Sequence, residues 1–368
     1  MGKFYDITRL ASTGATYRIA FSGRSDGKTY QVLMLALDMF LKTGKQLAII
    51  RRWGVDFDGP QGAGTCFNSL MCNAEQVNEI DRMSHGKYQG VIFSAGKYYL
   101  ARTDSEGMLV RTSDVIAIGF CLNKAEHYKM ASFPQIGMIL FDEFIATGDR
   151  YINNEYQLFN SVLSTILRTR DGVPVYMMAN TLNVRGCIYF REFCIPQVKT
   201  MKKGEINVYT LNETTFAVEY IDSTGEEKKK KSAKYFSYSK KNAMTVSGDW
   251  EIPIVPHLPI RYKPSDVIQT FFVETPDDLL QCEFIDVEGS VILFIHPKTT
   301  LLKDPDNDVI YSYRNDTRKN WHRTLDDGSK LSNIIKKFWA QADKMYFADN
   351  ETGAAFFNFV TQKNKITS

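Results

Sequence analysis

The most informative stretch of this chain is residues 17–29, Tyr-Arg-Ile-Ala-Phe-Ser-Gly-Arg-Ser-Asp-Gly-Lys-Thr. The apolar residues 17–21 predict a strand, and residues 29–43 have the pattern of a helix. A strand, a glycine-containing loop, Lys-Thr and a helix together form a phosphate-binding P-loop, in which backbone N–H groups and the positive helix end cradle phosphates. The residues expected to bind nucleotide here are Ser22, Gly23, Arg24, Ser25, Asp26, Gly27, Lys28 and Thr29.

Within this motif Lys28 is expected to reach the β- and γ-phosphate oxygens, and the Thr29 hydroxyl to ligate Mg²⁺. The motif is imperfect, because Ser22 stands where the pattern has its first glycine. Serine keeps such a loop tight only if its φ stays negative. A plain strand–turn–helix junction is the alternative interpretation.

Two carboxylates end the most apolar strand pattern in the first half of the chain, residues 136–144, Ile-Gly-Met-Ile-Leu-Phe-Asp-Glu-Phe. A continuous apolar run predicts a strand buried on both faces, as in a parallel sheet. Asp142 is expected to hold Mg²⁺, and Glu143 to orient or deprotonate the attacking water. The alternative is a strand that ends in a solvated acidic turn.

The first 200 residues alternate strand and helix patterns, which predicts an α/β domain with a mainly parallel sheet. Further strands are expected at residues 46–53, 115–121 and 173–178, with a helix at residues 155–168. A strand inserted between the P-loop strand and the carboxylate strand, with glutamate next to aspartate, is typical of the additional-strand, catalytic-glutamate P-loop NTPases. Those proteins are generally motors.

Length and composition limit the class of protein. The chain has 368 residues, enough for two domains, and its 44% hydrophobic and 24% charged residues are typical of a soluble globular protein. No stretch has the length of a membrane span, and the six cysteines lack zinc-ligand spacing. A net charge of +3 excludes a generally basic surface, so any DNA contact must come from a local patch.

Two more residues fit a nucleotide-hydrolysing site. Arg168 ends a helix pattern, from which an arginine can reach across a subunit interface and stabilise charge on the transferred phosphoryl group. Asn180 follows a strand pattern, where it can sense the γ-phosphate or the attacking water. The alternatives are a cation at a helix C-terminus for Arg168 and a turn-forming side chain for Asn180.

Together these residues resemble the DNA-packaging ATPases of small tailed phages of the phi-29-like type, which are related to the large terminase motors. The resemblance runs nearly end to end. It rests on Arg24 inside the loop, Arg51-Arg52 before the aromatic Trp53, Phe141-Asp142-Glu143-Phe144, Arg168-Thr169-Arg170 and Asn180.

The resemblance implies an ATP-driven motor that moves double-stranded viral DNA into a procapsid, with ATP and Mg²⁺ as cofactors. It implies that Arg168 is the arginine finger and that Lys129 acts in trans on a neighbour's nucleotide. The partners would be double-stranded DNA and the portal, or connector, of the procapsid, with no membrane. The subunits would form a homo-oligomeric ring, for which the family suggests five copies. The protein would act in the host cytoplasm, transiently at the procapsid vertex. Use of a structural packaging RNA is left open.

Three regions are expected: an ATPase domain over residues 1–204, a linker over residues 205–264, and a C-terminal domain over residues 265–368. The linker carries a basic, aromatic-dotted segment at residues 226–241, which either contacts a phosphate backbone or is a solvated hairpin tip. Residues that contact DNA are not assigned.

By the same resemblance the last region is an α+β ribonuclease-H-like domain that docks and contacts nucleic acid. Two-metal cutting needs several converging carboxylates. Glu274, Asp286 and Asp349 are candidates, but their spacing favours ordinary surface carboxylates, so nuclease activity is not expected.

Two other functions share these features. A cellular ring helicase or translocase would have the same site without the capsid partner. A P-loop scaffold would bind nucleotide without turnover.

Overall fold

The computed structural model describes residues 5–23, 26–57, 62–73, 75–146, 151–180, 187–222, 255–275, 278–314, 316–323, 327–340 and 344–363. The chain divides into two compact units, Met1–Trp250 and Glu251–Ser368. Among the described residues, no helix combines the length and the apolar character needed to cross a membrane. The basic segment at residues 226–241 lies outside the described residues.

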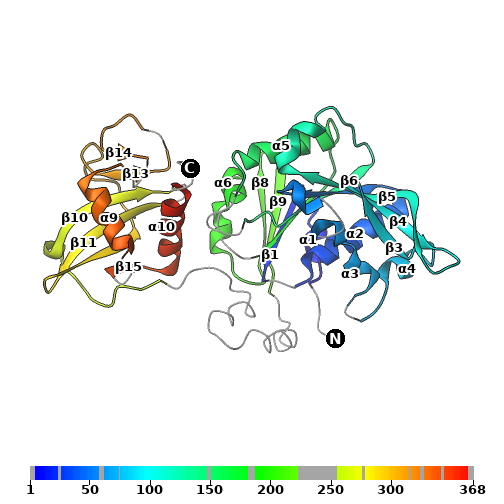
Figure 1. Ribbon diagram of the computed structural model, residues 1–368, viewed down its shortest axis with the longest axis horizontal. Helices are drawn as coiled ribbons and strands as arrows, with labels where there is room; N and C mark the ends of the chain where they lie inside the picture. The colour runs from blue at the N-terminus through cyan, green and yellow to red at the C-terminus, as the bar shows by residue number, and fades with distance from the viewer. Residues whose placement is uncertain are drawn as a thin grey trace. The chain divides into compact units, whose positions relative to one another are not determined.

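The first unit is built on a nine-stranded sheet with the order β3-β4-β5-β2-β6-β7-β1-β9-β8 (Figure 1). Its strands are β1 (Tyr17–Ser22), β2 (Gln46–Arg51), β3 (Gly90–Ser94), β4 (Lys97–Thr103), β5 (Leu109–Cys121), β6 (Ile136–Asp142), β7 (Val175–Asn180), β8 (Ile206–Leu211) and β9 (Thr214–Tyr220). Six adjacent strands of this sheet run parallel to one another: β5, β2, β6, β7, β1 and β9. The strands β3, β4 and β8 pair antiparallel at the two sides.

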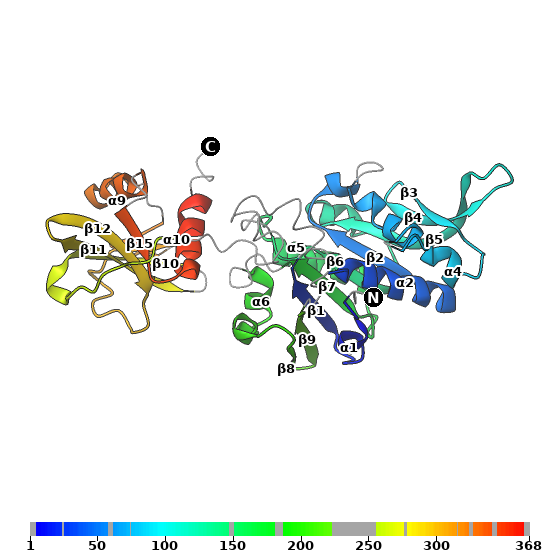
Figure 2. The same cartoon turned by 90° about the horizontal axis from the view of Figure 1, so that it is seen from below.

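Helices cover both faces of this sheet (Figure 2). They are α1 (Thr8–Ala11), α2 (Lys28–Thr43), α3 (Asn68–Met71), α4 (Glu79–Met83), α5 (Glu155–Leu167) and α6 (Ile188–Glu192). Side chains of a strand alternate between faces. Ile19 and Phe21 therefore join the core under α5 and α6, and Ala20 joins the core under α1 and α2. Burial on both faces explains the continuous apolar runs of the central strands.

Strand β7 lies between the P-loop strand β1 and the carboxylate strand β6. An inserted strand at this place was predicted from the sequence. The mixed α/β fold with a large, mostly parallel sheet is therefore as expected. Because the central strands are parallel, their carboxyl ends share one edge of the sheet.

The sheet extends beyond residue 204, where the sequence predicted the end of the ATPase domain. Strand β9 pairs in parallel with β1, and β8 pairs with β9. Residues 206–220 are therefore part of the first sheet and not a linker. Sequence reasoning missed them because their polar neighbours hide Phe216, Ala217 and Val218, which are buried against the P-loop strand.

A second difference concerns residues 91–121, where the sequence pattern predicts one hairpin over residues 91–111, turning at residues 104–107, and a separate strand at residues 115–121. They form three antiparallel-paired strands, because an additional turn at Ala95 and Gly96, both with positive φ, separates β3 from β4. The amino-terminal part of β5 continues beyond its pairing with β2, which begins at Ala117. The β4–β5 hairpin thus projects from the sheet.

The second unit contains a six-stranded sheet with the order β14-β13-β10-β11-β12-β15. Its elements are β10 (Val267–Glu274), β11 (Leu279–Val287), β12 (Ser290–Pro297), β13 (Ile310–Ser312), β14 (Trp321–His322), α9 (Lys330–Ala340), β15 (Met345–Phe347) and α10 (Asn350–Lys363). The strands β10, β11 and β12 form an antiparallel meander, while β13, β14 and β15 are added in parallel. Ile335 of α9 and Phe356 of α10 pack on the same core cluster as Phe271 and Cys282.

The pairing of β8 and β9 with the first sheet predicts where the first unit can be truncated without loss of its fold. A fragment of residues 1–204 loses β9, so one edge of β1 becomes unpaired and the core loses Ala217 and Val218, which are both 0% exposed. We expect this fragment to aggregate, because unpaired strand edges and exposed apolar surface favour association. A fragment of residues 1–222 is the matched control and is expected to unfold cooperatively on heating, as followed by circular dichroism. Equal melting behaviour of the two fragments would contradict the assignment.

Candidate active site

Four strand ends bring predicted site residues to one edge of the first sheet. Ser22 ends β1, Arg51 ends β2, Asp142 ends β6 and Asn180 ends β7. Ser22 lies directly opposite Asn180 in the register of β1 and β7. Ligands of open α/β sheets bind outside the carboxyl ends of the strands, so this edge is the candidate site.

The loop between β1 and α2 has the backbone that a P-loop turn requires at its end. Gly27 has φ +85°, a left-handed conformation that glycine adopts without strain, and Lys28 begins the helix. Ser22 belongs to the extended strand β1, so this position does not require a glycine. Arg24 and Ser25 lie outside the described residues.

Lys28 is buried with only neutral oxygen atoms around its ammonium group. Its Nζ donates to Ser22 Oγ and to the Gly23 carbonyl oxygen, both at 2.8 Å, and to Asn180 Oδ1 at 3.4 Å. The residue is 6% exposed, and among the described residues no carboxylate forms an ion pair with it. A buried cation that is not directly paired with an anion is unfavourable. This arrangement fits an anion such as a phosphate group.

Burial lowers the pKa of Lys28 to about 8, and the nearby carboxylates Asp26 and Asp142 oppose this shift. The ammonium form is therefore held less firmly than on an exposed lysine. A bound phosphate would supply the missing negative charge and favour that form.

Thr29 and Asp142 offer oxygen ligands of the kind that Mg²⁺ prefers. Thr29 Oγ1 donates to Asp142 Oδ1 at 2.9 Å, which places the hydroxyl and the carboxylate side by side. Burial raises the pKa of the Asp142 carboxyl, with a further contribution from the neighbouring Glu143. The oxygen atoms of Thr29 and Asp142 fit Mg²⁺, and the adjacent buried Lys28 fits a phosphate. The roles of Thr29 and Asp142 as metal ligands are predictions.

Arg51 joins three carboxylates, a contact that sequence reasoning missed. Its Nη1 lies 3.0 Å from Asp142 Oδ2, its Nη2 lies 2.9 Å from Glu143 Oε2, and its Nε lies 3.1 Å from Asp56 Oδ2. Burial acts to lower the pKa of Arg51, but the three carboxylates outweigh it and raise the pKa. The position of Arg51 at a strand end was visible in the sequence, whereas its partners depend on β2 and β6 being neighbours.

Glu143 follows β6 in a left-handed conformation with φ +58°, and its side chain is 56% exposed. Arg52 holds this turn, because its guanidinium donates to the carbonyl oxygens of Glu143 and Phe144. The Arg52 Nε also lies 2.9 Å from Glu155 Oε2, which is fully buried. Strained backbone of this kind persists where surrounding contacts fix it, and it is common at active sites.

Arg168 and Lys129 lie together, although they do not lie at the edge that holds Lys28. Arg168 Nη2 donates to the carbonyl oxygens of Ala131, at 2.7 Å, and Lys129, at 3.5 Å. The Lys129 Nζ forms an exposed ion pair with Glu126 at 2.5 Å. The structure thus groups both residues that the resemblance assigned to action in trans.

These two residues belong to the opposite, amino-terminal edge of the sheet. The helix α5 starts at Glu155, beside Arg52 at the carboxyl edge, and runs for 13 residues, so it spans about 20 Å. Beyond its end, Arg170 donates to the carbonyl oxygen of Ile136, the first residue of β6. Arg168 therefore cannot reach the Lys28 site of its own chain in this conformation.

Comparisons with known proteins also indicate similarity to phage DNA packaging proteins. Residues 111–272 match the family model described as Podovirus DNA encapsidation protein (Gp16). This chain is 21% identical over 208 residues to the DNA packaging proteins of Bacillus phages PZA and phi29, and the match covers 56% of this chain and 54% of each relative. The chain thus spans about half the length of these curated relatives.

Two solved structures of phage DNA packaging motors share its fold. The bacteriophage phi-29 viral genome packaging motor assembly has a chain that is 18% identical, with a TM-score of 0.58 and coverage of 97% of this chain and 99% of that chain. The phi-28 gp11 DNA packaging motor gives 17% identity, a TM-score of 0.51 and 98% coverage of both chains. The resemblance expected from the sequence is therefore confirmed, and these structures support the fold.

The depressed pKa of Lys28 predicts how nucleotide affinity depends on pH. Below about pH 8 the free protein carries the ammonium form, whereas above it a proton must be taken up before phosphate can bind. We expect the ATP dissociation constant to rise about tenfold per pH unit between pH 8.5 and 9.5, as measured by calorimetry. In the Lys28→Arg control the charge does not titrate, so any residual affinity should be independent of pH. Constant affinity of the unaltered protein over this range would contradict the burial argument.

Proposed function

We propose that this protein is an ATP-driven motor that translocates double-stranded viral DNA into a procapsid. The observation that carries the proposal is the buried Lys28 ammonium, which forms no direct ion pair with a described carboxylate, beside the Thr29–Asp142 pair and Glu143. That arrangement suits a nucleotide triphosphate with its metal ion. The similarity to DNA packaging proteins of Bacillus phages supports DNA as the cargo.

At the carboxyl edge each subunit would bind ATP in the loop from Ser22 to Thr29, with Lys28 against the β- and γ-phosphates. Thr29 and Asp142 would hold Mg²⁺, which when bound neutralises charge that develops on the phosphate oxygens. Glu143 would accept a proton from the attacking water, and Asn180, hydrogen-bonded to Lys28, would sense the γ-phosphate.

The other half of the site would come from a neighbouring subunit. Arg168 and Lys129 are grouped at the opposite edge of the sheet, about 20 Å along α5 from Glu155. Residues at opposite edges of one subunit can complete each other's sites in a head-to-tail ring. Arg168 would then act as the arginine finger and Lys129 would contribute a second charge.

We further propose that the second unit is a ribonuclease-H-like domain that docks and does not cut DNA. Its meander β10-β11-β12, with β13 and β14 added in parallel beside β10, supports that fold. Glu274 and Asp286 lie at opposite ends of the paired β10 and β11, about 20 Å apart.

Each candidate nuclease carboxylate has a structural partner. Glu274 accepts hydrogen bonds from Ser312 and Arg314, and Asp349 accepts one from the Thr352 backbone N–H at 2.7 Å. Asp286 accepts one from the backbone N–H of Gly289 at 2.9 Å. Carboxylates that are dispersed and engaged in this way do not suit a two-metal site.

In this proposal the ring of subunits, with five copies suggested by the resemblance, acts at the portal of the procapsid in the host cytoplasm. Use of a structural packaging RNA would belong to that docking step. ATP and Mg²⁺ are the cofactors, and double-stranded DNA is the cargo.

The catalytic role is tested with the variant Glu143→Gln, which keeps the size of the side chain and removes its basicity. We expect ATP hydrolysis to fall by about 10²- to 10⁴-fold with ATP binding retained, because general-base catalysis contributes about that much. DNase protection of linear duplex DNA by matching procapsids should be lost. Hydrolysis without protection would indicate a translocase with another partner, and unwinding of forked DNA would indicate a helicase. Equal hydrolysis by variant and unaltered protein, or none by either, would contradict the proposal.

The action of Arg168 in trans is tested by mixing inactive subunits. Arg168→Ala subunits keep an intact Lys28 site, and Lys28→Ala subunits keep an intact arginine, so a mixed ring contains some complete interfaces. We expect partial recovery of ATP hydrolysis in this mixture. A mixture of Lys28→Ala with Glu143→Gln subunits is the matched control and should show no recovery, because both defects lie at the same edge. Recovery in neither mixture would count against action in trans.

A further inference from the structure

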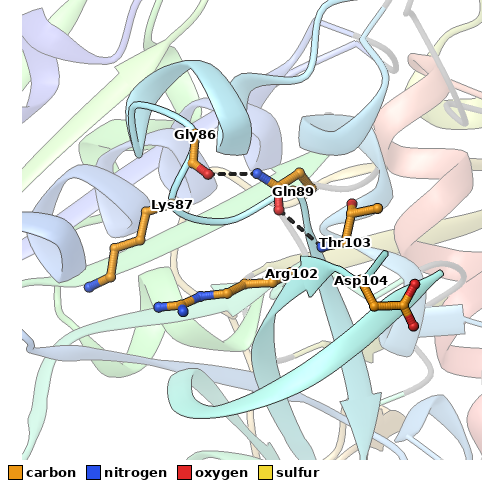
Figure 3. Close-up of a pocket in the computed structure, with 6 residues that line it drawn as sticks. All are labelled: Gly86, Lys87, Gln89, Arg102, Thr103 and Asp104. Atoms are coloured by element: carbon orange, nitrogen blue, oxygen red, sulfur yellow. Dashed lines mark hydrogen bonds between the residues drawn. The ribbon is translucent and has the colours of Figure 1, made fainter. Parts of the chain in front are cut away.

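A groove with two basic side chains lies beside the turn of the β4–β5 hairpin, away from the candidate active site (Figure 3). It has a volume of about 550 Å³, and it is lined by Gly86, Lys87, Gln89, Arg102, Thr103 and Asp104. We define these six residues as the hairpin groove. They come from the segment between α4 and β3 and from the end of β4.

Two cations are held side by side in the hairpin groove. Figure 3 shows the side chains of Lys87 and Arg102 extending in the same direction, while Asp104 points away from them. The Lys87 Nζ lies 4.9 Å and the Arg102 Cζ lies 5.5 Å from the centroid of the Tyr88 ring. That ring is only 1% exposed, and its hydroxyl donates to Asp114 at 2.6 Å. A fixed aromatic ring thus holds both cations in place.

Neither cation is neutralised within the part of the chain that the structure describes. No ion pair joins Lys87 or Arg102 to a described carboxylate, and the neighbouring acids are engaged elsewhere. Asp104 Oδ1 accepts from the backbone N–H groups of Glu106 and Met108, both at 2.9 Å. Like charges held close together without a counter-ion are unfavourable. The arrangement therefore favours an anionic ligand.

The groove is preorganised by Gln89. Its Nε2 donates to the Gly86 carbonyl oxygen at 2.7 Å and to Asp81 Oδ1 at 3.0 Å, and its Oε1 accepts from the Thr103 N–H at 3.1 Å. These bonds tie the segment that carries Lys87 to the strand that carries Arg102. The cations therefore need little ordering when a ligand binds.

We propose that the hairpin groove binds the phosphate backbone of double-stranded DNA without reading its sequence. An open groove with two unpaired cations and no enclosed pocket for a base or sugar suits a phosphodiester chain better than a small anion. With a net charge of only +3 for the whole chain, DNA contacts must come from such local patches. This inference rests on the proposed function for its cargo and assigns residues to that contact.

The test compares DNA binding by the unaltered full-length chain and by three double variants, two of which lose two positive charges. Lys87→Gln with Arg102→Gln removes the pair in the hairpin groove. Lys45→Gln with Lys202→Gln removes one half-buried and one exposed lysine of the same unit outside the groove. Lys87→Arg with Arg102→Lys keeps both charges. The probe is a fluorescent 30-base-pair DNA duplex, titrated by anisotropy at several salt concentrations, with an RNA duplex of equal length in parallel.

We expect the slope of log affinity against log salt for DNA to become shallower by about two in the groove variant, because each phosphate contact contributes about one. The charge-keeping variant and the lysine control should retain most of the slope. Melting temperature and ATP hydrolysis without DNA should be unchanged, since the groove lies outside the candidate active site.

The assignment would be overturned if the salt dependence of DNA affinity were unchanged in the groove variant. It would also be overturned if the lysine control lost as much of this slope, or if only the slope for RNA changed. Absence of duplex binding by the unaltered chain would also overturn it. If that chain hydrolyses ATP and packages DNA while its groove variant binds DNA normally, the groove assignment alone fails. If it neither hydrolyses ATP nor packages DNA, the proposed function itself fails.

Discussion

The parallel pairing of β1, β7, β6 and β2 is the constraint on which the candidate site depends. Parallel strands present their carboxyl ends at one edge of a sheet, so Ser22, Asn180, Asp142 and Arg51 meet although they are far apart in the chain. The buried apolar cores on both faces fix this arrangement, since a shift of one residue in any strand would exchange its two faces. The positions of the polar groups thus follow from the packing of apolar ones.

Charge is arranged unevenly along this edge. Lys28 is surrounded by neutral acceptors, while Asp142 and Glu143 share the guanidinium of Arg51 a short distance away. In a partly dehydrated site such charges interact more strongly than in water. A phosphate group beside Lys28 would supply the negative charge that its neutral acceptors do not provide. Arg51 balances the carboxylates in the structure described here.

The structure also places the predicted site residues at two different edges of the first sheet. Lys28 and Asp142 lie at the carboxyl edge, whereas Arg168 and Lys129 lie at the amino edge, with α5 spanning the distance between them. The proposed DNA groove belongs to a hairpin that projects beyond the pairing of β5 with β2. A subunit with complementary halves at opposite edges is suited to head-to-tail assembly, in which each copy completes the site of the next. This links the shape of the fold to the proposed ring.

Elements whose signals are local could be predicted from the sequence. The run of residues 17–29 fixed a strand, a loop and a helix, and the apolar run before Asp142 fixed a buried strand, because these patterns depend on neighbours in the chain. The sequence patterns did not predict β8 and β9 as parts of the first sheet, because their burial depends on pairing with β1. The contacts of Arg51 with Asp142, Glu143 and Asp56, and the position of Lys87 beside Arg102, could not be predicted from local patterns. Those contacts join residues from different elements, and packing alone sets their distances.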